Sequence, residues 1–230
     1  MEMIRVIITG STGMVGEGVL YECLRSEQVE AVLVINRKPC GYSHPKLSEI
    51  IHNNFYNLKP IESELRGYNA CYFCLGVTSV GKNEEEYTRL TYDLTLHVCE
   101  LISQNNTDLT ICYISGAGTY SDEKGKLMWA RVKGKTENDI MRLKEVKGFA
   151  FRPGIIKPIK GLKFTHQAYK YFLWVFPIIK LFSSNGFCSL EQIGKAMIQV
   201  SMVGRKDPRL EVKDIIEEAA KYDAVYNEVV

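Results

Sequence analysis

Three evenly spaced glycines follow the first apolar run of the chain directly. The run from Ile4 to Thr9 leads into a Gly-Ser-Thr-Gly-Met-Val-Gly turn, and a helical pattern begins at once. Such a turn lets backbone N–H groups approach a pyrophosphate at a helix N-terminus, where the helix dipole favours an anion. The alternative is a turn in which the glycines serve only the backbone. We expect a nucleotide-binding loop made of Gly10, Ser11, Thr12, Gly13, Met14, Val15 and Gly16.

The second apolar run ends in two basic residues. It covers Ala31 to Asn36, and Arg37 and Lys38 follow. An acid at this place would bind the ribose 2′-hydroxyl of NAD, whereas cations can pair with the 2′-phosphate of NADP. We therefore expect Asn36, Arg37 and Lys38 to contact the cofactor and NADP to be preferred over NAD. A solvated basic turn is the alternative.

Apolar β-branched runs alternate with segments of helical period along most of the chain, as in a parallel sheet with helices on both faces. The fold class is therefore α/β, a doubly wound parallel Rossmann-type sheet with a small C-terminal helical substrate-covering region. The expected strands are Ile4–Thr9, Ala31–Asn36, Ser48–Asn53, Ala70–Leu75, Leu109–Ser115 and Gly148–Arg152. The expected helices are Gly16–Arg25, Glu84–Asn105, Leu127–Lys144, Thr165–Phe182, Leu190–Val203 capped by Ser189, and Glu211–Tyr222. We expect one domain over residues 1–230, with 157–188 covering the substrate.

Composition narrows the class of protein further. The 230 residues carry a net charge of +2, too balanced for a protein that mainly binds nucleic acid. The apolar runs are too short for a signal peptide or for stable membrane insertion, so we expect a cytoplasmic protein. The seven cysteines are scattered, which indicates reduced thiols, and Cys71 and Cys74 fall within a strand that favours core packing. The four histidines lack paired ligand spacing, so no metal site is expected.

Five segments together resemble the short-chain dehydrogenase/reductase superfamily, in its atypical branch of Tat-interacting-protein-like and NAD-dependent epimerase/dehydratase-like proteins. They are Thr9–Gly16, Cys74–Thr78, Ser115–Ala117, Val132–Gly134 and Phe151–Gly154. The resemblance implies a Rossmann sheet and a nicotinamide cofactor. It also implies cofactor contacts from Leu75, Gly76, Val77 and Thr78, from Pro153, Gly154 and Ile155 near the nicotinamide, and from Asn54 and Phe55 near the adenine.

The family's catalytic set is similar to Ser, Tyr and Lys, with Tyr and Lys four residues apart on one helix. Ser115 and Lys133 match, and the resemblance gives Ser115 the substrate oxygen and Lys133 the cofactor ribose. The position of the tyrosine holds Trp129, whose indole N–H is a donor that cannot act as an acid near neutral pH. Tyr120 is an alternative proton donor, because catalytic groups often lie on loops.

Two functions follow from this pattern. The first is an NADP-binding oxidoreductase or epimerase-like enzyme that transfers a hydride to or from a small carbonyl or alcohol; a separate lobe for a nucleotide sugar is not expected. The alternative is a catalytically weak NADPH-bound sensor or interaction protein, in keeping with Trp129. Aromatic residues of the expected Thr165–Phe182 helix could line an apolar substrate pocket, form a homodimer contact or touch a membrane surface.

Overall fold

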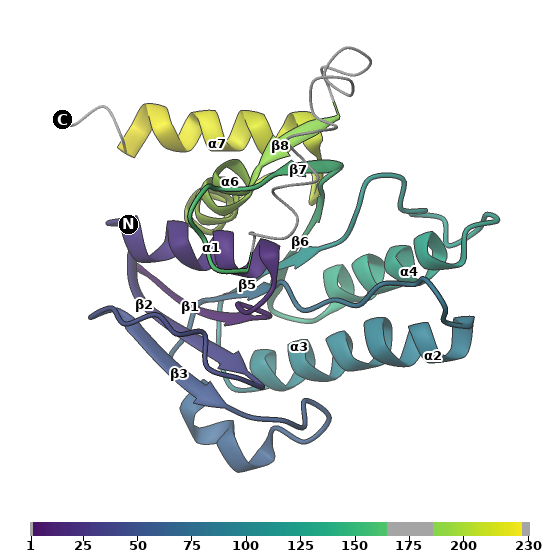
Figure 1. The fold of residues 1–230 in the computed structure, drawn as a ribbon, viewed down its shortest axis with the longest axis horizontal. Helices are drawn as coiled ribbons and strands as arrows, with labels where there is room; N and C mark the ends of the chain where they lie inside the picture. Colours follow the sequence, from purple (N-terminus) through teal and green to yellow (C-terminus); the bar gives the residue numbers. More distant parts are fainter. Residues whose placement is uncertain (1, 165–185, 227–230) are drawn as a thin grey trace.

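A parallel sheet forms the centre of the computed structural model, which describes residues 2–164 and 186–226 (Figure 1). In spatial order its strands are β3 (Leu47–Ile51), β2 (Val29–Asn36), β1 (Ile4–Thr9), β4 (Ala70–Phe73), β5 (Leu109–Ile114), β6 (Val146–Arg152) and β9 (Arg209–Glu211). Strand β1 pairs with β2 on one side and with β4 on the other. The order of the strands therefore reverses beside β1, the place where sheets of this kind bind ligands at the carboxyl ends of their strands.

Helices cover both faces of the sheet (Figure 1). One face carries α1 (Met14–Arg25), α6 (Leu190–Val203) and α7 (Val212–Tyr226). The other carries α3 (Leu94–Gln104), α4 (Met128–Arg142) and the 3₁₀ turn η1 (Lys59–Leu65). The expected doubly wound Rossmann-type α/β fold is confirmed.

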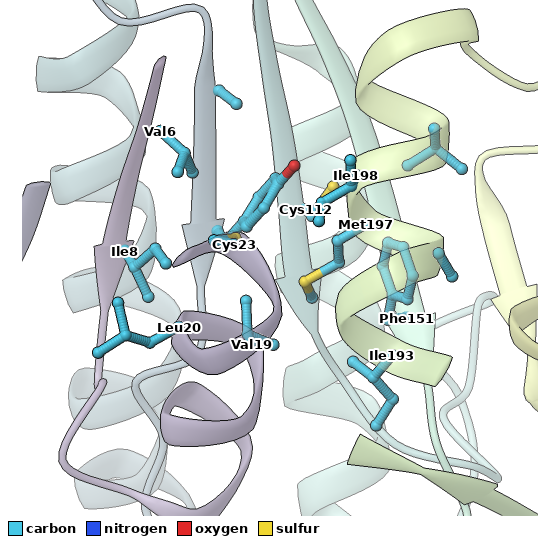
Figure 2. Packing of buried hydrophobic residues seen from close by; sticks show 14 of the residues in the cluster. Val6, Ile8, Val19, Leu20, Cys23, Cys112, Phe151, Ile193, Met197 and Ile198 are labelled. Carbon is cyan, nitrogen blue, oxygen red and sulfur yellow. The ribbon is translucent and has the colours of Figure 1, made fainter. Parts of the chain in front are cut away.

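Two hydrophobic clusters hold these layers together, one on each face. Along β1, Val6 and Ile8 belong to the first cluster and Ile7 to the second, because successive side chains of a strand point to opposite faces. Figure 2 shows the first cluster, to which α1 contributes Val19, Leu20 and Cys23 and α6 contributes Ile193, Met197 and Ile198. Burial on both faces explains why the strands are continuous apolar runs.

The helix expected over Glu84–Asn105 is interrupted. It consists of α2 (Glu84–Thr88), the π-helical turn η2 (Arg89–Asp93) and α3. Within it the Thr95 hydroxyl donates to the Thr91 carbonyl, and such side-chain bonds to the preceding turn distort helices locally. Apolar periodicity cannot reveal this change, because the pattern on either side of η2 is helical.

The C-terminal region adds two short strand pairings. Strand β9 extends the sheet beside β6, and its three residues include one apolar side chain, so no apolar run marks it. Strands β7 (Ile155–Lys157) and β8 (Phe187–Ser189) form a separate parallel pair. Residue 157, the first residue of the expected substrate-covering segment, is the last residue of β7.

The predicted cap of α6 is confirmed. The Ser189 hydroxyl accepts from the backbone N–H of Gln192 at 3.1 Å, and the Gln192 side chain accepts from the Ser189 N–H at 2.8 Å. This reciprocal pair is a capping box, which fixes the first turn of the helix. The aromatic helix expected at Thr165–Phe182 lies outside the described residues.

Candidate active site

The three glycines of the loop after β1 differ in how much space the protein leaves for a side chain. Gly10 has φ +74°, and a Cβ there would lie 2.7 Å from the backbone nitrogen of Leu75. A Cβ at Gly16 would lie 2.1 Å from the carbonyl oxygen of Gly10. The backbone alone therefore requires Gly10 and Gly16. At Gly13, which is exposed, the nearest atom to a Cβ would be 3.4 Å away, an ordinary contact, so the protein itself leaves space there.

Gly13 is also the N-cap of α1. It has an extended conformation, with φ −108° and ψ 164°, and its position makes no side-chain capping bond. The first-turn N–H groups of a helix have no partner within the helix, and they favour an anion. This end of α1, with the open space at Gly13, fits the phosphates of a nucleotide.

A hydrogen-bond chain connects the glycine loop to β2 and β3. The Ser11 hydroxyl donates to Oδ1 of Asn36 at 2.9 Å, and the Asn36 amide donates to Oε1 of Glu49 at 2.8 Å. The same carboxylate oxygen accepts from the backbone N–H of Cys40 at 2.8 Å. Ser11 and Asn36 are buried, and their hydrogen bonds fix the glycine loop and the turn that follows β2. From the sequence we expected both residues to contact the cofactor directly.

A hollow of about 550 Å³ opens beside the glycine loop. It is lined by Thr12, Arg37, Lys38, Pro39, Asn53 and Phe164. Arg37 and Lys38 are exposed, so both cations can reach a ligand in this hollow. The basic pair thus lies where the adenosine half of a dinucleotide belongs relative to the end of β2.

The two residues expected near the adenine have other surroundings. Phe55 is 5% exposed and belongs to the second hydrophobic cluster, so its ring is part of the core. The Asn54 side chain accepts from the N–H of Tyr56 at 3.1 Å and shapes its own turn. The lining residue from this stretch is the preceding Asn53, which the sequence analysis missed.

The loop after β4 lies against the glycine loop. The backbone of Cys74 and Leu75 comes within 3 Å of where a Cβ on Gly10 would be, and it allows no side chain there. Beyond it Gly76, Val77 and Thr78 are exposed, and the Thr78 hydroxyl accepts from the N–H of Val80 at 3.2 Å. This segment is therefore placed beside the phosphate loop with its tip open to a ligand.

The two catalytic candidates meet at the end of β5. Nζ of Lys133 in α4 donates to the carbonyl oxygen of Ser115 at 2.8 Å. The Ser115 hydroxyl lies 3.0 Å from the Thr119 hydroxyl, which in turn donates to the carbonyl of Gly116 at 2.8 Å. Because that bond uses the Thr119 proton, Ser115 is the donor in the first pair. Sequence reasoning missed Thr119, which orients the serine.

Burial changes the acidity of Lys133. Removal of water from the ammonium group lowers its pKa to about 8, although the nearby Glu137 carboxylate acts in the opposite direction. The amine is held by the Ser115 carbonyl and faces the Tyr113 ring at 5.8 Å. This lysine is therefore a fixed donor that can change charge near physiological pH.

The indole of Trp129 lies over the turn that contains Ser115. A Cβ at Gly116 would be 3.8 Å from Cζ3 of Trp129, and one at Gly118 would be 3.9 Å from Cη2. Trp129 and Lys133 are one helical turn apart on α4, so both reach the same end of β5. The ring of Tyr120 instead packs where a side chain on Gly125 would be. Trp129, four residues before Lys133, therefore places its indole beside the turn that contains Ser115.

The segment after β6 continues next to the loop after β5. The Pro153 carbonyl accepts from the N–H of Ala117 at 3.0 Å, while Gly154 and Ile155 are exposed. Below them Arg152 is 7% exposed and pairs with the buried Glu137, its Nη2 lying 2.5 Å from the carboxylate. This buried pair fixes the end of β6 to α4, the helix that carries Lys133.

The donor set fits a nicotinamide dinucleotide: open space at Gly13, a hollow with two cations, and a lysine and a serine together at the adjacent strand end. Within residues 2–164 and 186–226, no three His, Cys, Asp or Glu side chains are grouped as metal ligands. In the same part of the chain, no helix has the length and apolarity needed to cross a bilayer.

Solved structures confirm the fold. WbmF of Bordetella bronchiseptica, in complex with NAD+, matches with a TM-score of 0.65 at 13% identity, over 99% of this chain and 79% of that one. A dTDP-glucose 4,6-dehydratase (DesIV) from Streptomyces venezuelae, with NAD bound, gives 0.64 at 12% identity, over 95% and 80%.

Curated relatives correct the expected location. FMP52-2 of Scheffersomyces stipitis is 27% identical over 65% of this chain and 65% of its own length, so the match spans just under two thirds of that relative. FMP52 of Meyerozyma guilliermondii is 20% identical over 97% of this chain and 98% of its own. Both are named as mitochondrial proteins, and this overturns the expected cytoplasmic location. Short apolar runs do not define a compartment.

Two further matches bear on the family. HTATIP2 of Rattus norvegicus is 24% identical over 66% of this chain and 62% of its own length, which confirms the expected resemblance. The family model described as "NAD dependent epimerase/dehydratase family" matches residues 6–137, the part that holds the glycine loop, Ser115 and Lys133. The chain therefore belongs to the NAD dependent epimerase/dehydratase family.

Proposed function

We propose that the protein is an NADP-dependent oxidoreductase that transfers a hydride to or from a small carbonyl or alcohol. The observation that carries the proposal is the hollow beside Gly13, where Arg37 and Lys38 are the charged lining residues. Two cations can neutralise a 2′-phosphate, which NAD lacks. The relatives solved with NAD are 12 to 14% identical, so they leave the choice of cofactor to these residues.

The side chains at the end of β5 would serve the substrate. When bound, the cofactor supplies the hydride acceptor or donor at its nicotinamide ring. The Ser115 hydroxyl proton, which Thr119 accepts in this structure, would turn to the substrate oxygen when a substrate is bound. Lys133, held by the Ser115 carbonyl, would donate to the ribose hydroxyls. Positioned donors of this kind stabilise charge that develops on an oxygen.

A second candidate is favoured by Trp129. Its ring lies over the Gly116 turn, where an enzyme of this type needs a proton donor. An indole cannot release a proton near neutral pH. The alternative function is a cofactor-bound sensor or interaction protein, which would keep the nucleotide site and show little turnover.

Two measurements test the proposal. Native mass spectrometry of the purified protein should detect bound NADP(H), and a panel of small ketones and aldehydes should be reduced with loss of NADPH absorbance. Gly13→Val is the matched control, because it removes the space for the phosphates. Bound NAD(H) without NADP(H) would contradict the cofactor assignment. Bound NADPH with no turnover on the panel would support the sensor.

A further inference from the structure

Phe164 is the one aromatic side chain among the described residues that line the hollow beside the glycine loop. It is 39% exposed, so part of its ring is open to a ligand. Phe164 lies far from the loop in sequence, after β7, while the other lining residues come from the loops after β1, β2 and β3. Something must therefore hold this segment against the first part of the sheet.

That contact is a buried carboxylate. Glu17, in the first turn of α1, is fully buried. Its Oε1 accepts from the Tyr42 hydroxyl at 2.6 Å and from the N–H of Lys163 at 2.5 Å, and its Oε2 accepts from the N–H of Phe164 at 2.8 Å. An ionised carboxylate only accepts hydrogen bonds, so three donors suit it. Two of them are consecutive backbone N–H groups, which fixes the direction of the chain at Phe164.

Lys163 adds a second attachment. Its Nζ donates to the carbonyl of Gly41 and lies 4.4 Å from the centre of the Tyr42 ring. Gly41 and Tyr42 follow the turn that carries Arg37 and Lys38. Together these contacts join α1, the basic turn and residues 163–164 on one side of the hollow.

The hollow needs an apolar surface that its cations do not supply. Arg37 and Lys38 can bind phosphate, but an adenine ring binds to proteins largely by stacking on flat apolar groups. Phe55, the aromatic residue expected for this role, is part of the core. Phe164 has an exposed ring in the same hollow as Thr12 and Arg37.

We propose that Phe164 forms the wall on which the adenine of the cofactor stacks, and that Glu17 is the positioning residue that holds it there. This inference rests on the proposed function, since it assumes a dinucleotide in the hollow. The adenosine half of the cofactor would then contact the loops after β1, β2 and β3 and also Phe164, which comes much later in the chain. Glu17, which follows the glycine loop directly in the sequence, would support the base through its contacts with residues 163 and 164.

The test separates the two halves of the cofactor. Dissociation constants for adenosine 2′,5′-bisphosphate and for nicotinamide mononucleotide are measured by calorimetry on the full chain. Phe164→Ala should weaken the adenosine compound about tenfold and leave the nicotinamide compound unchanged, since stacking on an aromatic ring accounts for roughly 5- to 150-fold in affinity. Phe164→Trp should restore the binding. Val203→Ala removes another exposed apolar side chain, at the end of α6, and should change neither constant.

Glu17→Gln tests the anchor. The amide keeps one acceptor oxygen and loses the other, so at least one of the three donors is left without its partner. The variant should bind adenosine 2′,5′-bisphosphate several-fold more weakly, and its preference for NADP over NAD should stay as in the wild type. Equal weakening of both half-cofactors would show a general loss of structure and overturn the positioning role.

Unchanged affinity in Phe164→Ala, in a protein where Arg37→Ala weakens the same compound, would overturn the inference and leave the proposed function standing. A wild-type chain that binds neither NADP nor adenosine 2′,5′-bisphosphate would overturn both. Because Phe164 is partly exposed, its truncation should leave the fold intact, and a thermal unfolding curve checks this.

Discussion

Ser11 and Asn36 are joined by a buried hydrogen bond of 2.9 Å, so the glycine loop is fixed to the carboxyl end of β2. The amide of Asn36 then donates to Glu49, whose carboxylate also holds the N–H of Cys40. The acid that contacts the end of β2 is therefore Glu49 of β3, and its hydrogen bonds hold the turn after β2. In the proposed function, discrimination between NADP and NAD would depend on the exposed Arg37 and Lys38.

Replacement of Arg37 by alanine should reduce the preference for NADP over NAD by about 1.5 to 3 kcal/mol, the contribution of a charge-assisted hydrogen bond. Calorimetric titration with each cofactor measures it. Lys59→Ala, at an exposed lysine in η1, is the control and should change neither affinity. Equal affinities of the wild type for the two cofactors would contradict the prediction.

Gly13→Val should abolish nucleotide binding while the protein still folds. The extended backbone at Gly13 suits a β-branched residue, and a Cβ there meets nothing closer than 3.4 Å, but the side chain would fill the space for the pyrophosphate. Circular dichroism and a fluorescence titration with NADPH measure the two properties. Gly16→Ala is the contrasting variant: its Cβ would lie 2.1 Å from the Gly10 carbonyl oxygen, so it should lose thermal stability. Retained binding in a folded Gly13→Val protein would place the ligand elsewhere.

Trp129→Tyr should raise reductase activity on a small ketone or aldehyde. The indole lies over the Ser115–Gly118 turn, and a phenol at the same place could transfer a proton, a contribution of typically 10²- to 10⁴-fold. Tyr120→Phe should have little effect, since the Tyr120 ring packs against Gly125. Steady-state rates of the two variants and the wild type give the comparison. Strong wild-type turnover that Lys133→Ala leaves unchanged would exclude a catalytic site at Ser115 and Lys133.

Glu22 makes stability depend on pH in a definite direction. Burial, with the nearby Glu191 carboxylate, raises its pKa from 4.5 to about 7, while Lys195 and Arg25 oppose the shift. As pH rises from about 4.5 to 7 the unfolded chain releases this proton first, so the free energy of unfolding falls. Glu22→Gln should remove that fall and be about 1 to 3 kcal/mol more stable than wild type near pH 8, with little difference near pH 4. Urea unfolding at both pH values measures it, and a variant that gains as much at pH 4 as at pH 8 would refute this cause.

The sequence predicts the parts of the fold that local patterns encode. The six strands with apolar runs and the cap at Ser189 are found within a few residues of the expected bounds. Strand β9 is not predicted from the sequence, because it has three residues and carries charged side chains at both ends. The π turn at 89–93 escapes because helical periodicity continues on either side of it.

The candidate site also contains residues that local sequence patterns predict and residues that they do not. The glycine loop and Arg37 follow from spacing, because each comes directly after a strand, whereas Ser115 and Lys133 follow from the resemblance to the family's catalytic set. Phe55 looks equally suitable in sequence, yet it is in the core. Phe164 reaches the hollow through contacts with Glu17, and no local pattern reports a contact between segments so far apart in the chain.

The packing of α6 against α1 has a consequence for synthesis on the ribosome. Val19 and Leu20 of α1 share a cluster with Ile193 and Met197 of α6, which the chain supplies much later (Figure 2). At 5 to 20 residues per second, translation of the intervening stretch takes on the order of ten seconds or more. During that time one face of the nascent sheet is uncovered, and exposed apolar surface of this kind promotes aggregation. We therefore expect nascent chains that stop before α6 to bind chaperones and complete ones to be released.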